Sequence, residues 1–393
     1  INSISLCERY FPNPSKTPPQ ACWVAATGQR RCAVDTTLTP RALANQPASR
    51  MAANELSLCR QQRILRASPE RFEKILLLRR QIVSLHPLPQ MAGGFFLSDG
   101  GLETTLVFLD RIELPHFAAF VLLDDELGRE RLKQYYVPYL EICAELPGAG
   151  FVLETPTWRA NPDWAHLLGV DAAKLRKVNV EAAQLMRSLR DRWAPRLSGP
   201  IVVSGVIGPR GDGYVAAAPG SVEDAAAYHT PQAQALAAGG VDMLAAVTMT
   251  TSAEALGVAL AAQRVGLPAA ISFTVETDGR LPSGEHLGEA IERVDASAPP
   301  AYFAVNCAHP SHFAHVLQAA GPWAARVRGI RANASTKSHA ELDESTELDI
   351  GDPTDLAQRY RGLRSALPNL NVLGGCCGTD WRHLRAVRDA WVA

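Results

Sequence analysis

Three cysteines in the second half of the chain are the residues whose chemistry is most clearly marked. Cys376 and Cys377 are neighbours in the run Gly-Gly-Cys-Cys-Gly-Thr at residues 374–379, and Cys307 precedes this pair in Val-Asn-Cys at 305–307. Zn²⁺ binds cysteine sulfur readily, prefers four tetrahedral ligands, and keeps one position open in catalytic sites. Three protein thiolates therefore indicate a zinc site with room for a water or substrate ligand.

The spacing of these cysteines differs from that of structural zinc sites, which pair two Cys-x₂-Cys units. Neighbouring side chains point to opposite faces of a strand, so Cys376 and Cys377 can reach one ion only where a strand ends. Gly375 and Gly378 allow the backbone angles that such a turn needs. The pair alone is equally compatible with two buried apolar cysteines or a bond between the neighbours. Adding Cys307 favours zinc.

The composition is that of an ordinary globular protein with a large core. The chain has 393 residues, of which 47% are hydrophobic and 20% charged, and its formal net charge is -1. Such a balance favours neither a nucleic-acid partner nor a membrane surface, and no apolar run approaches the roughly 20 residues that cross a bilayer. We therefore expect a soluble, cytoplasmic protein; the oligomeric state stays open.

The first ninety residues differ from the rest in charge and pattern. They hold 13 Lys and Arg against 5 Asp and Glu, and four of the eight cysteines. One interpretation is a targeting segment, since transit peptides are rich in Arg and Ser and poor in acids. The other, which the length and the missing amphipathic pattern favour, is upstream sequence before a native start at Met91. We predict that residues 1–90 are a poorly ordered extension with one helix over 69–85.

From residue 91 onward, short apolar runs alternate with longer amphipathic ones, which is typical of successive β-α units around a parallel sheet. The predicted strands lie at 95–98, 151–154, 201–206, 243–247, 269–273, 302–305, 328–332 and 371–374, with helices between them at 172–192, 221–238, 252–265 and 310–320. Eight strands fit a (β/α)₈ TIM barrel over residues 91–393. The competing fold is a doubly wound sheet. It is less favoured because this chain has no Gly-x-Gly-x-x-Gly turn after the first predicted strand.

The barrel prediction places the polar residues together. Catalytic side chains of such barrels lie at the C-terminal ends of the strands. Cys307 would end the sixth strand, and Cys376 and Cys377 the eighth. Further polar residues follow other predicted strands: Asp99, Glu154, Thr155, Thr248 and Asn333.

Four motifs together resemble the homocysteine S-methyltransferase family. They are Ser-Asp-Gly-Gly at 98–101, Gly-Val-Ile-Gly-Pro at 205–209, Val-Asn-Cys at 305–307 and Gly-Gly-Cys-Cys-Gly-Thr at 374–379, spread over residues 95–392 in the family's order. The resemblance implies a zinc-dependent barrel that moves a methyl group onto a thiol, with Cys307, Cys376 and Cys377 as metal ligands. Family members take the methyl group from a sulfonium compound, from betaine or from a methylfolate. Because no cobalamin or folate module is seen in this sequence, we expect the stand-alone type with a sulfonium or betaine donor.

The resemblance also implies substrate contacts. Asp99, beside Gly100 and Gly101, would bind the amino group of an amino-acid thiol, although an Asp in such a turn can instead bond its own backbone. Asn333 matches a polar residue of the family, and Asn306, next to a ligand, would orient the zinc site.

One position departs from the family pattern. The fourth strand usually ends in a glutamate that helps to bind the substrate amine, whereas this chain has Val247 before Thr248. Glu154, followed by Thr155 at the second strand end, would then supply a substitute carboxylate or be purely structural.

Three further residues near these motifs have competing roles. Trp158 and Trp164 would either form an aromatic wall for a cationic donor or pack in the core. His309 lies close to Cys307, but three cysteines and a substrate already complete the tetrahedron, so we expect a loop histidine.

The sequence therefore predicts a zinc-dependent S-methyltransferase that acts on a small-molecule thiol and a methyl donor, with homocysteine as the leading acceptor and methionine as product. A zinc-bound thiol reacts as the thiolate and needs no side-chain base. Two alternatives remain: a related enzyme that methylates another thiol or a selenol, and a non-catalytic barrel that holds zinc or a thiol.

Overall fold

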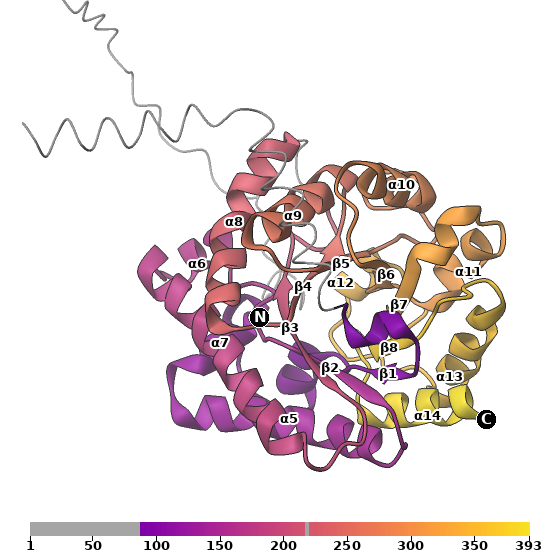
Figure 1. Cartoon of the computed structure of the whole chain (residues 1–393), viewed down its shortest axis with the longest axis horizontal. Coiled ribbons are helices and arrows are strands. Elements are labelled where there is room, and N and C mark those ends of the chain that lie inside the picture. Colours follow the sequence, from indigo (N-terminus) through magenta and orange to yellow (C-terminus); the bar gives the residue numbers. More distant parts are fainter. Residues whose placement is uncertain (1–86, 217–219) are drawn as a thin grey trace, which may run out of the picture. The chain divides into compact units, whose positions relative to one another are not determined.

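The computed structural model describes residues 87–216 and 220–393, and within them eight parallel strands close into a barrel in the order β1 to β8. Helices surround the strands in chain order (Figure 1). The (β/α)₈ barrel is therefore confirmed, and the doubly wound alternative is excluded. The predicted helix at 69–85 and almost all of the predicted extension lie outside the described residues.

All eight predicted strands are present, with ends that differ from the predictions by a residue or two. The strands are β1 (Phe96–Leu97), β2 (Gly150–Glu154), β3 (Ile201–Ile207), β4 (Met243–Met249), β5 (Ala269–Phe273), β6 (Tyr302–Asn306), β7 (Val327–Ala332) and β8 (Val372–Gly375). The first strand pairs with the last through Phe96 and Val372, which closes the barrel.

The longer helices of the described chain cover the outside of the barrel. They are α5 (Glu126–Ala144), α6 (Pro162–Leu167), α7 (Ala172–Trp193), α8 (Val222–Gly239), α9 (Ser252–Val265), α10 (Leu287–Ser297), α11 (Pro310–Gln318), α13 (Pro353–Gly362) and α14 (Trp381–Val392). Two short helices, α4 (Leu102–Thr104) and α12 (His339–Asp343), follow β1 and β7. No helix in the described ranges is long and apolar enough to cross a membrane.

Local sequence sets where several of these helices begin. The side chains of Asp125, Asp171, Ser221 and Thr251 each accept a hydrogen bond from the backbone N–H three residues later, at the starts of α5, α7, α8 and α9. Such caps satisfy N–H groups that have no partner within the helix. The starts of α7, α8 and α9 therefore lie within one residue of the predicted ones, whereas α5 was not predicted.

Successive side chains of each strand alternate between the helix layer and the barrel interior. On β2, Phe151 and Leu153 pack into the large core against the helices, whereas Val152 belongs to a smaller cluster inside the barrel. That inner cluster also contains Leu88, so the folded unit starts before Met91. The boundary between 90 and 91 stays a prediction, but a chain that begins at Met91 lacks part of this cluster.

Candidate active site

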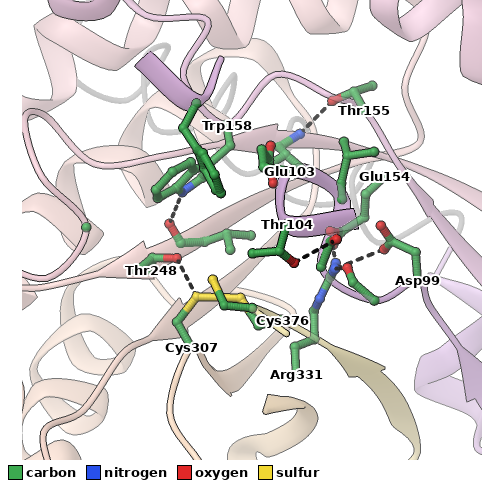
Figure 2. Close-up of a pocket in the computed structure, with 18 of the residues that line it drawn as sticks. Asp99, Glu103, Thr104, Glu154, Thr155, Trp158, Thr248, Cys307, Arg331 and Cys376 are labelled. Atoms are coloured by element: carbon green, nitrogen blue, oxygen red, sulfur yellow. Dashed lines mark hydrogen bonds and ion pairs between the residues drawn. A yellow bond between two sulfur atoms is a disulfide. The ribbon is translucent and has the colours of Figure 1, made fainter. Parts of the chain in front are cut away.

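The three predicted ligand sulfurs lie together at the C-terminal end of the barrel. Cys307 follows β6, Cys376 and Cys377 follow β8, and their sulfur atoms all lie within 4.8 Å of one another. Cys307 and Cys376 are joined as a disulfide, so the bond between neighbours that the sequence left open is not the one found (Figure 2). Because a disulfide has no thiolate, the cluster can bind a metal ion through three thiolates only after this bond is reduced.

The turn after β8 brings the neighbouring cysteines to the same side. Gly378 has a φ of 78°, which an L-residue rarely adopts. Gly375 does not share this angle; a Cβ there would instead overlap the Thr379 side chain. The predicted role of Gly378 is therefore confirmed, while Gly375 is needed for close packing and not for its backbone angle.

A chain of hydrogen bonds leads from β4, β5 and β6 to the Cys307 sulfur. The Thr248 hydroxyl donates to Cys307 Sγ at 3.7 Å, and Asn306 Nδ2 donates to that same hydroxyl at 2.8 Å. Asn306 Oδ1 in turn accepts from the Thr248 N–H at 2.9 Å and from the Ser272 hydroxyl at 2.6 Å. Asn306 thus fixes the residue that contacts the sulfur, which suits the orienting role predicted for it.

Cys377 has a different neighbour, Tyr214. The Tyr214 hydroxyl lies 3.5 Å from Cys377 Sγ, and its ring stacks on His339 with centroids 4.0 Å apart. His339 Nε2 lies 2.8 Å from the Cys307 carbonyl oxygen, and its Nδ1 lies 3.0 Å from Glu276. Burial raises the pKa of the Cys377 thiol to about 11. The surrounding protein therefore does not itself supply the positive charge that would ionise this thiol at neutral pH.

The cysteines line a cavity that encloses about 720 Å³ of space, part of it open to solvent. Its wall includes Asp99, Glu103, Glu154, Tyr214, Val247, Thr248 and Arg331, contributed by the ends of several strands and the loops that follow them. A second cavity of about 620 Å³ shares Thr104, Phe117, Tyr214 and Cys377 with the first. All three cysteines thus line the first cavity, and Cys377 also lines the second.

Arg331 on β7 is the central charge of the first cavity. Its guanidinium lies 2.9 Å from Asp99 Oδ1, forms an ion pair with Glu154, and donates to the carbonyl of Gly100 at 3.2 Å (Figure 2). Tyr135 donates to the other Asp99 oxygen at 3.0 Å. Burial raises the pKa of Asp99, an effect that Arg331 and Tyr135 oppose. Asp99 and Glu154 therefore reach the cavity, as predicted, but already have a cationic partner.

Four other predicted contacts are less available to a ligand. The Gly101 N–H donates to the Thr379 carbonyl at 3.0 Å. The Thr155 hydroxyl accepts from the Val206 N–H at 2.9 Å, so it ties β2 to β3. Asn333 is buried and lines neither cavity. Gly100 lines the first cavity, and its carbonyl bonds Arg331.

Trp158, Trp164 and His309, for which the sequence left two roles open, lie in different surroundings. Trp158 lines the cavity, and its indole N–H donates to the Val247 carbonyl at 3.3 Å. Trp164 is buried outside the cavity wall, with the Arg159 guanidinium 3.7 Å from its ring. His309 caps α11 by accepting from the Ser311 N–H, and the metal-ligand cluster does not include it.

Arg331, Tyr214 and Glu103 were missed by the sequence reasoning. Arg331 had a usable signal, because it is a charged residue near the C-terminal end of a predicted barrel strand. Tyr214 lies in a loop with no periodic pattern and had none. Glu103, one turn after the Asp-Gly-Gly motif, lines the cavity, and burial raises its pKa to about 7.

Comparison with known proteins places this geometry in context. The family model described as Homocysteine S-methyltransferase matches residues 96–391. The Homocysteine S-methyltransferase 1 proteins of Arabidopsis thaliana and Zea mays are 23% and 25% identical, over 79% and 77% of this chain and 98% and 96% of their own lengths.

Solved structures of the homocysteine methyltransferase MmuM from Escherichia coli share the fold. The oxidised form matches with a TM-score of 0.60 at 21% sequence identity and covers 75% of this chain and 95% of its own. The metallated form matches with a TM-score of 0.58 at 21% identity and covers 79% of this chain and 98% of its own. Because the family model spans most of the chain, the protein belongs to the homocysteine S-methyltransferase family and is by class a methyltransferase.

Proposed function

We propose that this protein transfers a methyl group from a small cationic donor to the thiolate of a small-molecule acceptor, with homocysteine as the leading acceptor and methionine as product. The observation that carries the proposal is the cluster of three sulfurs in the wall of one cavity, at the end of the barrel where catalytic groups lie. Family membership supports the same class of reaction.

Zn²⁺ fits the donor set, because three cysteine thiolates are soft ligands that leave a fourth position open. Cys307, Cys376 and Cys377 would hold it. When bound, the ion supplies the positive charge that keeps an acceptor thiol ionised near neutral pH. Thr248, which donates to the Cys307 sulfur, and Tyr214, beside the Cys377 sulfur, orient two of the three ligands.

The methyl transfer balances without a side-chain base. The acceptor thiol gives its proton to solvent, its sulfur forms the new bond to the methyl carbon, and the electron pair of the broken bond goes to the donor's sulfur or nitrogen. In sulfonium and betaine donors the methyl group is carried by a positively charged sulfur or nitrogen, and the cavity offers the aromatic side chains of Trp158, Phe117 and Tyr214 to such a charge. The part of the cavity that lies away from solvent limits water around the reacting charges.

The test uses the full chain under reducing conditions, loaded with zinc, and follows methionine by mass spectrometry. Homocysteine is combined in turn with S-methylmethionine, S-adenosylmethionine and betaine. We expect methionine with at least one donor, and no product after Cys376→Ala. Cys143→Ala is the matched control, because Cys143 is a buried free cysteine on α5 away from the cavity.

Two other outcomes would redirect the assignment. Product from another thiol or a selenol, without methionine, would retain the transferase chemistry and replace the acceptor. Zinc binding without turnover for any donor and acceptor would indicate a protein that only holds zinc or thiols.

A further inference from the structure

Arg331 occupies the position in the cavity where a substrate cation would be expected to bind. Its guanidinium lies between two carboxylates from different strands, Asp99 after β1 and Glu154 at the end of β2 (Figure 2). It also donates to the backbone carbonyls of Gly100 and Gly375. Burial alone would lower the pKa of Arg331, but Asp99 and nearby tyrosines raise it above its ordinary value. The side chain therefore stays charged beside both acids.

Apart from Glu103, the cavity wall formed by the described residues holds no further carboxylate that could bind an ammonium group. At the end of β4, Val247 presents an apolar side chain. Asp99 is buried, with one oxygen on Arg331 and the other on the Tyr135 hydroxyl. Both acids therefore already have a cationic partner inside the protein before any substrate enters.

A binding site selects for a polar group of the substrate when the protein group that pairs with it is left unpaired by substrates that lack it. A site with a free buried carboxylate rejects an analogue that lacks the amine, because the carboxylate then loses its hydrogen bonds. Here the guanidinium supplies those bonds permanently. An acceptor without an amino group then leaves no buried acid unpaired at this position.

We infer that Arg331 takes the place of the acceptor's ammonium group, so that this enzyme accepts small thiols lacking an amino group about as well as homocysteine. The inference rests on the proposed function and extends its acceptor class to small thiols without an amine. Arg331 acts as a specificity-determining residue, because it sets which acceptor group the two carboxylates can recognise.

Glu103 is the one competing anchor that the structure suggests. It lines the same cavity, and no ion pair of its carboxylate is found among the described residues. The test must therefore separate Glu103 from the Arg331 cluster.

The experiment compares homocysteine with 4-mercaptobutyrate, which differs only in lacking the amino group. On the zinc-loaded full chain, kcat/KM is measured for both, and dissociation constants are measured by calorimetry. We expect the ratio of homocysteine to 4-mercaptobutyrate to lie within tenfold for the unchanged protein. A larger preference for homocysteine would overturn the inference while leaving the proposed function intact.

Variants of Arg331 and of Glu103 complete the test. Arg331→Met exposes Asp99 and Glu154, so the ratio should rise tenfold or more, whereas Arg331→Lys should keep it near that of the unchanged protein. An unchanged ratio in Arg331→Met, or a tenfold fall in Glu103→Gln, would overturn the inference. If neither thiol is methylated, the proposed function fails. The ratio of the two dissociation constants then tests the inference by the same tenfold limit.

Discussion

The two ends of the barrel use the same eight strands for different purposes. Strand β7 shows this with its two arginines. Arg331 pairs with Asp99 and Glu154 at the C-terminal end, while Arg328 donates to the Gln90 carbonyl at 3.5 Å near the other end. Apolar side chains such as Leu88 and Met243 fill the interior at that N-terminal end. One end is packed for stability, and the other is left open and polar.

Backbone strain follows the same division. The five described non-glycine residues with positive φ are Arg111, His116, Phe117, Thr248 and Cys307. Each lies at the end of a strand or in the segment after it, on the side of the cavity. Such angles are costly and persist where the surrounding structure enforces them, often at functional sites. The difference suggests that the cavity end gives up some stability to place Thr248 and Cys307.

Among the changes at either end of the barrel, removal of a sulfur ligand should have the largest effect on activity. We expect Cys376→Ala, in the reduced full chain, to lower methyl transfer by about a thousandfold or more, since a metal-dependent step loses roughly 4 kcal/mol or more of transition-state stabilisation. Bound zinc per chain, measured by mass spectrometry of metal ions, should fall with it. Full activity in this variant would show that the sulfur cluster is not the reaction centre.

At the opposite end the expected effect is on stability. Met243 is fully buried, and Gln90 donates to its sulfur at 3.3 Å. Met243→Ala should lower the free energy of unfolding by about 2–5 kcal/mol through lost burial and a cavity. Activity per folded molecule should stay within about twofold, as checked by urea unfolding and initial rates. Loss of activity without loss of stability would contradict the separation of the two ends.

The hydrogen bond to Cys307 should have an intermediate effect. Thr248→Val removes the hydroxyl that contacts the sulfur, so zinc affinity should fall about 10- to 100-fold, which competition with a chelator measures. Thr250→Val is the matched control, because the buried Thr250 hydroxyl has no partner in the described part of the chain. Equal affinities in the two variants would exclude a role for the Thr248 contact.

The smallest effect should come from an ion pair away from the cavity. Glu145, at the end of α5, pairs with Arg385 and Arg388, and hydrogen bonds from these two arginines lower its pKa to about 2. Its contribution is present above its unfolded pKa of about 4.5 and is lost as pH falls toward 2. Because Glu145 is half exposed, Glu145→Gln should cost under ~1 kcal/mol at pH 7. A difference between the two proteins that grows on acidification would contradict this sign.

Sequence reasoning predicted the strands and the sulfur cluster because both depend on local pattern. Apolar runs defined β1 to β8, and the order of strands brought Cys307 to Cys376 and Cys377. The charge pairing was out of reach, because which acid Arg331 contacts depends on barrel closure between β7, β8 and β1. The sequence therefore identified Asp99 and Glu154 correctly as lining the cavity but not as already paired.

The most direct test of the sulfur cluster is zinc-edge X-ray absorption of the reduced, zinc-loaded full chain, with and without homocysteine. The structure leads us to expect three sulfur neighbours at about 2.3 Å, rising to four when the thiol is added. A zinc ion surrounded by nitrogen and oxygen alone, or a sulfur count that does not change with homocysteine, would contradict the proposed site.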